Sequence, residues 1–478
     1  MEKSDGRYQL VFDFYEARIK FGYYRFGENL PPIPEICDTF HLGRTTVRAA
    51  LSLLEKARYI RTEARKVARV CYQADDVQFE KNAAAYFVPR RDGLREFNRA
   101  SRLLLVPLWE ESRRRWDAAR WECWRREFSD ILSGGPPPSV KLYLMALKEL
   151  DNRLAFNLYW EAMRYITLPS LLDRRRVKHP IDGQAILASL NSGDATGYLS
   201  GRMAEIYLQL EEELFAFISR NSLKYGLESI EQIPFQWNIY RQRPQLRYTL
   251  SSLLIREIVY GKYPIGSYLP SLPAFAAQYG VSHATARRTL SLLEEMGVTK
   301  SFQGKGTQVC MERTRVNLDH SEIQEGLRLC RESLQLLSLT IYGVSCYTLE
   351  SSSKEIRAEL AERLRRSLKC GQSYYCFEIM LSFIKRQCPL AMIRECYGKL
   401  ADLVAWGYPF IRLLLADEEL ENAYSAWVER MERHLRRGNL DVFSSDWAAL
   451  MKQEEQQYNT FLLCEGPKYA DGKKNNDE

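Results

Sequence analysis

Residues 22–71 read GYYRFGENLPPIPEICDTFHLGRTTVRAALSLLEKARYIRTEARKVARVC, and residues 261–310 read GKYPIGSYLPSLPAFAAQYGVSHATARRTLSLLEEMGVTKSFQGKGTQVC. A shift of 239 positions aligns the two stretches without a gap, and about sixteen of the fifty positions are then identical. The identities fall on residue types that shape a backbone or a core: Gly22/Gly261, Tyr24/Tyr263, Gly27/Gly266, Leu30/Leu269, Pro31/Pro270, Pro34/Pro273, Thr46/Thr285, Arg48/Arg287, the block LSLLE at 51–55 and 290–294, Lys66/Lys305, Val70/Val309 and Cys71/Cys310. Duplication of one module is the economical explanation.

The first copy predicts three helices. Apolar residues at 8, 11, 12, 15 and 19 lie on one face of a helix over residues 8–20, and Gly22 suits the left-handed residue that ends it. Pro31 or Pro34 fits the first turn of a short second helix, about residues 34–40. A third helix follows Gly43 and turns Val47, Leu51 and Leu54 to the core. Two helices joined by a tight turn form a helix-turn-helix.

A β-hairpin, or wing, is expected after the third helix. In the first copy residues 59–61 and 67–72 predict its two strands. In the second copy Ser282 is a strong N-cap for the third helix, and Gly297 ends that helix. The hairpin KSFQGKGTQV then places Gly304 and Gly306 at its tip, where a positive φ is needed.

The rest of the chain reads as helices with apolar residues at three-to-four spacing. It too repeats loosely, because residues 93–105 resemble 326–337 and residues 168–172 resemble 408–411. We predict a mainly α protein in which two winged helix-turn-helix domains, each of three helices plus a wing, alternate with two all-helical domains. The expected boundaries are 1–73, 74–235, 241–312 and 313–470, with the join between the two halves near residues 221–245.

Basic charge is concentrated in the two modules. Residues 1–72 hold 13 Lys and Arg against 9 Asp and Glu, and residues 241–315 hold 11 against 4, so the two segments carry +4 and +7. The whole chain carries +7, which leaves −4 for the remainder. Two separate basic segments of similar size are the electrostatic footprint of nucleic-acid binding.

These modules resemble the DNA-binding domain of the GntR family. That domain looks like a helix ending in Gly-x-Tyr-x-x-Gly, then x-Leu-Pro-Ser, then Ser-Arg-x-Thr-Val-Arg-x-Ala-Leu, then a wing with Gly-x-Gly-Thr. The first copy shows GYYRFGENLPP and GRTTVRAAL, and the second shows GKYPIGSYLPS, SHATARRTL and GKGT. The match covers about 65 residues per copy. More faintly, the helical segments resemble the effector domains of the FadR-like branch, most closely at residues 181–199.

The resemblance implies double-stranded DNA as the partner and assigns the contact residues. The start of the third helix enters the major groove, where Arg can bond guanine bidentately. The expected contacts there are Arg44, Thr45, Thr46 and Arg48 in the first copy, and Ser282, His283, Thr285, Arg287 and Arg288 in the second. The wings would contribute Arg65 and Lys66 in the first copy, and Gly304, Lys305, Gly306 and Thr307 in the second.

The two copies depart from the family pattern in different places. The first keeps Arg44 in the helix and lacks both wing glycines, whereas the second keeps the glycines and has His283 at the arginine position. We therefore expect two different half-site readers in one chain, acting either as a monomeric pseudo-dimer or within a homodimer. The function expected is sequence-specific transcription regulation, with helical domains that sense a small-molecule effector or mediate dimerisation. The alternative is a sensor or interaction protein whose degenerate winged helices bind protein partners.

Other classes of site find little support in the sequence. The five histidines are His41, His179, His283, His320 and His434, so neither helical domain has the three His that some FadR-like domains use for a metal. No GxSxG, HExxH or Gly-rich phosphate loop is present, and we expect neither an enzyme nor a cofactor. The aromatic residues of the first helical domain, such as Trp160, suit either an effector pocket or, as we favour, a core. No stretch reaches the roughly 18 apolar residues that span a bilayer, and the eleven scattered cysteines suit a reducing compartment, so we expect a cytoplasmic protein.

Overall fold

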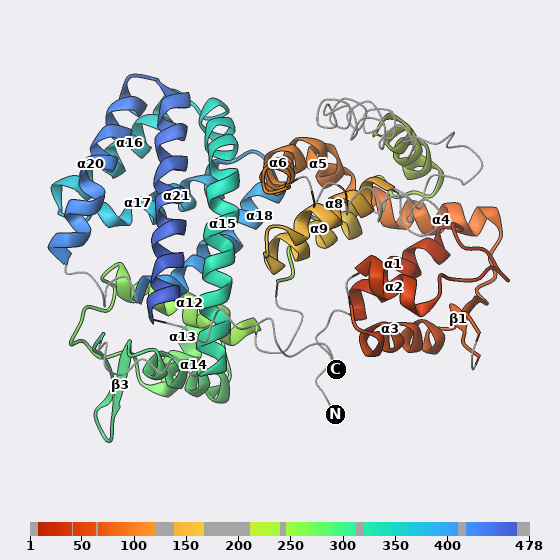
Figure 1. The fold of residues 1–478 in the computed structure, drawn as a ribbon, viewed down its shortest axis with the longest axis horizontal. Coiled ribbons are helices and arrows are strands. Elements are labelled where there is room, and N and C mark those ends of the chain that lie inside the picture. The colour runs from red at the N-terminus through yellow and green to blue at the C-terminus, as the bar shows by residue number, and fades with distance from the viewer. Residues whose placement is uncertain are drawn as a thin grey trace. The chain divides into compact units, whose positions relative to one another are not determined.

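The computed structural model describes residues 8–40, 42–63, 66–117, 119, 122, 138–166, 211–239, 245–311, 320–409 and 417–465. The chain forms two compact units, residues 1–242 and 243–478. Among the described residues the fold is mainly helical, with two short antiparallel hairpins, as the sequence predicts (Figure 1). Five features named above lie outside the described residues: His41, Arg65, residues 168–172, His179 and residues 181–199.

The first unit begins with a winged helix. Its elements are α1 (Tyr8–Lys20), α2 (Ile33–Phe40), α3 (Arg44–Lys56), β1 (Ile60–Arg61) and β2 (Arg69–Val70). The strands are shorter than predicted, because only Ile60–Val70 and Arg61–Arg69 pair. The helices that follow are α4 (Asp76–Phe87), α5 (Arg91–Leu104), α6 (Val106–Arg114), α8 (Pro138–Lys148) and α9 (Arg153–Ile166).

The second unit repeats this order. Its winged helix consists of α12 (Gln245–Val259), α13 (Leu272–Tyr279), α14 (His283–Glu295), β3 (Thr299–Phe302) and β4 (Gly306–Val309). The bundle that follows comprises α15 (Ser321–Glu350), α16 (Lys354–Lys369), α17 (Cys376–Gln387), α18 (Ala391–Val404), α20 (Asp417–Arg436) and α21 (Leu440–Glu465). The long helices α15 and α21 lie side by side in Figure 1 and form the most extensive helix pairing of this unit.

The duplication is visible in the local geometry of both winged helices. Gly22 and Gly261 have φ of +77° and +80°, which confirms the left-handed residue expected after the first helix. An isolated bridge joins Asn29 to Arg69 in the first copy, and the bridge Tyr268–Gln308 lies at the same repeat positions in the second. The two copies therefore share their backbone hydrogen bonds as well as their sequence.

The helical segments of the two units also share a structural feature, a helical glycine that faces an aromatic ring. A Cβ added to Gly93 in α5 would lie 2.2 Å from the hydroxyl of Tyr165, and one added to Gly326 in α15 would lie 2.2 Å from the ring of Trp406. In both halves a helical glycine thus lets a later aromatic ring approach the helix backbone closely.

Each winged helix packs on the helices that follow it in its own unit. In the first unit the ring of Phe40 stacks on Trp160 at 4.6 Å, and Arg164 of α9 forms an ion pair with Asp13 of α1 at 2.7 Å. Trp160 is buried, so it belongs to the core. In the second unit Arg256 of α12 pairs with Glu378 and, at 2.9 Å, with Asp402. These contacts join each winged helix to the helices that follow it.

Candidate nucleic-acid interface

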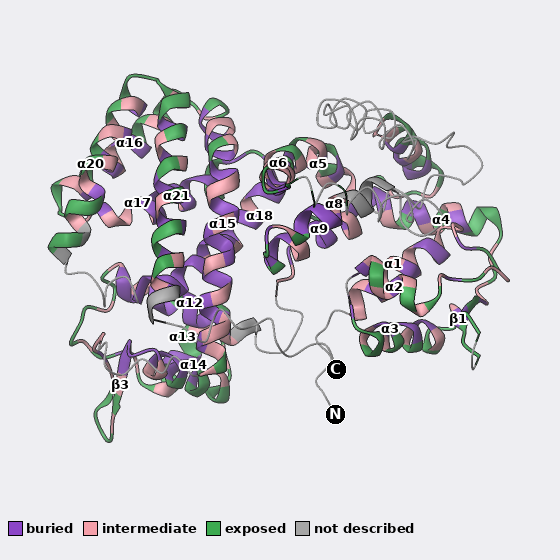
Figure 2. Cartoon of the chain, in the orientation of Figure 1, coloured by how far each residue is buried: buried purple, intermediate pink, exposed green. Residues whose placement is uncertain are grey.

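The recognition helix of the first copy presents a basic outer face. Val47, Leu51 and Leu54 are buried, as predicted, and this orients the opposite side of α3 outward. Arg44 and Arg48 are exposed and lie one turn apart on that side. Figure 2 shows the exposed face of α3. Within the described residues neither arginine is paired with a carboxylate, so both guanidinium groups are available to a ligand.

The start of α3 has no side-chain cap. Gly43 is extended at φ −66° and ψ 154°, and no side chain accepts a hydrogen bond from the first backbone N–H groups. Thr46 is half-buried and does not cap the helix, whereas Thr45 is exposed beside it. Free N–H groups and the positive end of the helix dipole favour an anion such as a DNA phosphate at this end.

The second recognition helix is capped by its own side chains. The Ser282 hydroxyl accepts a hydrogen bond from the backbone N–H of Thr285 at 3.1 Å, which confirms the predicted N-cap. The two hydroxyl oxygens also lie 2.9 Å apart. Because both groups are satisfied in the cap, their first role here is to start the helix. The resemblance predicts Ser282 and Thr285 as DNA contacts. A DNA phosphate would therefore have to bond to groups that already form the cap.

Three exposed side chains follow on the outer face of α14. They are His283, Arg287 and Arg288. Arg287 occupies the same repeat position as Arg48, and His283 the same position as Arg44. Neither Arg287 nor Arg288 has a carboxylate partner within the described part of the chain. The two recognition helices therefore share one arginine, Arg48 or Arg287, but the exposed residues next to it differ.

The two wings differ in length and in charge pairing. The second hairpin pairs four residues on each strand and projects from its winged helix in Figure 1. Gly304 and Gly306 have φ of +74° and +101°, which confirms the predicted turn, and Lys305 between them is exposed and has no carboxylate partner among the described residues. Thr307 is half-buried in β4, with its hydroxyl 3.4 Å from that of Ser301.

In the first wing Lys66 is exposed and forms an ion pair with Glu63 at 2.7 Å. An exposed pair of this kind contributes little to stability, so Lys66 can exchange Glu63 for a phosphate at low cost. Arg65 lies outside the described residues.

Sequence reasoning overlooked one pair of candidates. Arg61 in β1 is exposed, and Lys300 in β3 lies at the same repeat position. The signal was present in the alignment, since the shift of 239 places a basic residue at this point of both wings. The last residue of the shared LSLLE block, Glu55 in the first copy and Glu294 in the second, has a structural role. Glu55 accepts a hydrogen bond from the Thr62 backbone N–H at 2.6 Å, and Glu294 accepts one from Ser301 at 3.3 Å, which ties each recognition helix to its wing.

Comparisons with known proteins agree with this geometry. The family described as bacterial regulatory proteins, gntR family, matches residues 7–70 and again residues 248–309. No curated protein matches the chain. Among solved structures, a GntR protein of Streptococcus agalactiae is 14% identical, covers 44% of this chain and 99% of its own, and has a TM-score of 0.19.

Two further solved structures have similar values. A putative transcriptional regulator GntR from Rhodococcus sp. RHA1 is 16% identical with a TM-score of 0.25, and covers 45% of this chain and 98% of its own. A structure titled for Lar, which controls the Listeria monocytogenes agr system, is 12% identical with a TM-score of 0.19, and covers 46% and 99%. At these TM-scores the assignment depends on the two family matches. Residues 7–70 and 248–309 are therefore two copies of the DNA-binding domain of the gntR family of bacterial regulatory proteins.

Proposed function

We propose that the protein is a sequence-specific transcription regulator in which both winged helices read duplex DNA. The observation that carries this proposal is the arginine shared by the two modules. Arg48 and Arg287 are exposed on the outer face of their recognition helices, and within the described residues neither is engaged by a carboxylate. A guanidinium held this way suits bidentate bonding to guanine in the major groove.

The neighbours of this arginine differ between the two copies, and so should the half-sites. In the first copy Arg44 adds a second guanidinium one turn earlier, on an uncapped helix end. In the second copy His283 takes that place, Arg288 is added, and Lys305 extends the contact to the wing tip. A single chain would then read an asymmetric site without a second subunit. A homodimer would instead read two such sites.

Selection of binding sites from random duplex DNA with the full chain tests the proposal. We expect an enriched site with two unlike halves, whereas a strictly palindromic site would contradict the pseudo-dimer. If the complex includes four contacts with DNA phosphates, raising the salt from roughly 50 to 200 mM should weaken binding about a hundredfold, because those contacts release counterions. No enrichment over a scrambled duplex would favour winged helices that bind protein partners.

The helical segments would then connect DNA binding to a second event, either an effector or a dimer contact. The first helix of each winged helix is joined to its own helical segment by a half-buried ion pair, Arg164–Asp13 in one unit and Arg256–Glu378 in the other. A change in those helices would therefore move a recognition helix with it.

A further inference from the structure

A cavity inside the second unit lies between the end of α12 and the helical bundle. Its volume is about 50 Å³. At about 10–15 Å³ for each water, this is room for roughly three to five waters. Six aromatic residues line it: Tyr260, Tyr374, Phe377, Tyr408, Tyr424 and Tyr458. Such a space accepts about five non-hydrogen atoms, the size of a trimethylammonium head group.

One carboxyl group lines this aromatic cavity. Glu454 of α21 is 6% exposed, and the hydroxyl of Tyr424 donates a hydrogen bond to it at 3.0 Å. Among the described residues no Lys or Arg pairs with it. Burial raises the pKa of Glu454 to about 7. A buried carboxylate without a positive partner is costly, so the site gains from a cation.

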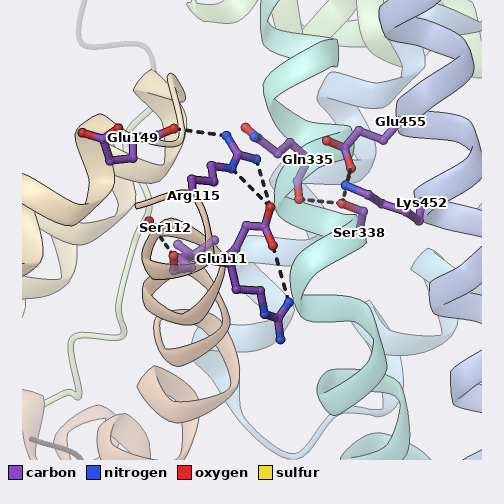
Figure 3. A network of polar contacts seen from close by, with 10 residues as sticks. Glu111, Ser112, Arg115, Glu149, Gln335, Ser338, Lys452 and Glu455 are labelled. Carbon is purple, nitrogen blue, oxygen red and sulfur yellow. Dashed lines mark hydrogen bonds and ion pairs between the residues drawn. The ribbon is translucent and has the colours of Figure 1, made fainter. Parts of the chain in front are cut away.

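The adjacent glutamate shows what a satisfied carboxylate looks like in this helix. Glu455 is equally buried, but it pairs with Lys452 at 2.7 Å and accepts a hydrogen bond from Ser338 at 2.6 Å (Figure 3). It does not line the cavity. Glu455 thus has a positively charged partner, whereas Glu454 lines the cavity and, among the described residues, has none.

The chemistry of the walls selects the class of ligand. Aromatic rings attract a cation through their negative faces, and quaternary ammonium groups are bound in this way. An anion would meet Glu454 and no basic residue among those that line the cavity. We propose that this cavity binds a compact organic cation, an ammonium or quaternary ammonium group, held by the Glu454 carboxylate and the surrounding aromatic rings.

The position of the cavity couples it to the second winged helix. Val259 ends α12 and lines the cavity together with Tyr260. The carbonyl of Val259 accepts a hydrogen bond from Tyr375 at 2.9 Å, so the same turn is attached to the bundle. A cation in the cavity touches both parts, and it will bias their arrangement if it binds one arrangement more tightly. This coupling rests on the proposed DNA binding, whereas the site itself does not.

Isothermal titration calorimetry of the full chain with choline tests the site directly, without DNA. We expect choline to bind, its uncharged tert-butyl analogue to bind at least about tenfold more weakly, and acetate not to bind. Glu454→Gln should weaken choline binding at least about tenfold, and the matched control Glu455→Gln should leave it unchanged. Equal binding of choline by Glu454→Gln, equal binding of the uncharged analogue, or no binding of choline at millimolar concentration would each overturn the proposal.

A second variant guards against loss of folding in Glu454→Gln. Tyr374 is half-buried at the cavity wall, and Tyr374→Leu removes one ring while it keeps an apolar side chain. We expect choline binding to weaken at least about threefold, and unchanged binding would count against the aromatic walls.

The coupling has its own measurement. Saturating choline should change the affinity of the wild-type chain for its selected duplex at least about threefold and leave Glu454→Gln unaffected. Choline that binds without any change in duplex affinity would contradict the coupling. Because calorimetry is done without DNA, failure of the site and failure of DNA binding are read separately.

Discussion

Lys305 stands between two left-handed glycines at the tip of the second wing, where its ammonium is exposed. A lysine on a phosphate contributes to the salt dependence of binding more than to sequence preference. We expect Lys305→Ala to weaken binding to all duplexes alike and to reduce the slope of log affinity against log salt by about 1. Titration by fluorescence anisotropy at several salt concentrations measures this slope. Lys369→Ala, an exposed lysine in α16, is the control, and an equal change in both variants would argue against a wing contact.

Burial of Glu454 predicts that the stability of the folded chain depends on pH. Its pKa is about 7 in the folded chain, whereas an ordinary glutamate, as in the unfolded chain, has a pKa of 4.5. Below about pH 4.5 the carboxyl is protonated in both states. As the pH rises toward 7, the unfolded carboxyl ionises freely while the buried one resists, so the folded state loses stability on the order of 3 kcal/mol.

Glu454→Gln removes this penalty. Its melting temperature should exceed that of the wild type by more at pH 8 than at pH 5, as followed by circular dichroism. Glu455→Gln breaks an ion pair with Lys452 and should lower the melting temperature. A gain for Glu454→Gln that does not grow with pH would contradict the buried, unpaired carboxylate.

At the scale of elements, the two recognition helices end in the same way with different residues. Arg58 has φ +61° after α3, and Gly297 has φ +69° at the same position after α14. The Cys71 thiol donates to the Arg58 carbonyl, and the Cys310 thiol donates to the Gly297 carbonyl, which gives the shared cysteines a structural role. A left-handed conformation costs a non-glycine residue roughly 1–2 kcal/mol, so the first copy is strained where the second is not.

Exchange of these residues tests the strain. Arg58→Gly should stabilise the first unit by about 1 kcal/mol, which raises its melting temperature by about 2–4 °C, and Gly297→Ala should destabilise the second by a similar amount. Differential scanning calorimetry resolves the change. Opposite signs in the two units are the expected result, and a destabilised Arg58→Gly would show that the arginine side chain contributes more than its backbone costs.

The winged helices were predictable because their signals are local. Gly22, Ser282 and the Gly304–Gly306 pair are residues whose conformation is dictated by caps and turns a few residues long. The wing strands of the first copy were predicted too long, because β-propensity extends past the two residue pairs that form the ladder. The shared basic position at Arg61 was overlooked although the alignment shows it, and the half-buried state of Thr46 was missed because side-chain burial depends on packing that the local sequence does not show.

On the scale of the whole molecule, the duplication explains why each unit has a winged helix followed by helices, but it does not explain how the two units differ. The stacking of Phe40 on Trp160 and the cavity around Glu454 bring together residues more than a hundred positions apart. No periodicity in the sequence encodes such contacts, because they depend on how helices pack. Trp116, Tyr159 and Trp160 of the first unit are buried, as the favoured core assignment predicts, whereas Trp109, Tyr143 and Phe156 are half-buried and the cavity of the second unit was not foreseen.

The two copies have also diverged in a buried charge. Arg18 of α1 is buried and lies 3.3 Å above the ring of Phe14, and burial lowers its pKa to about 10. Glu257 occupies the same repeat position and accepts a hydrogen bond from Tyr279 in α13. Glu257 is half-buried and also pairs with Lys262, so the first helices of the two modules carry opposite charges at this position.

The central claim is that both winged helices read DNA, and substitution of their shared arginine tests it most directly. Affinity for the selected duplex would be measured for the wild type, Arg48→Ala and Arg287→Ala, with Arg102→Ala in α5 as an exposed control. We predict that each of the first two variants loses about 1–3 kcal/mol, or roughly five- to 150-fold, and relaxes preference at a different half of the site, while the control binds as the wild type does. Unchanged affinity for either Arg48→Ala or Arg287→Ala would contradict the account and leave that copy without a reading role.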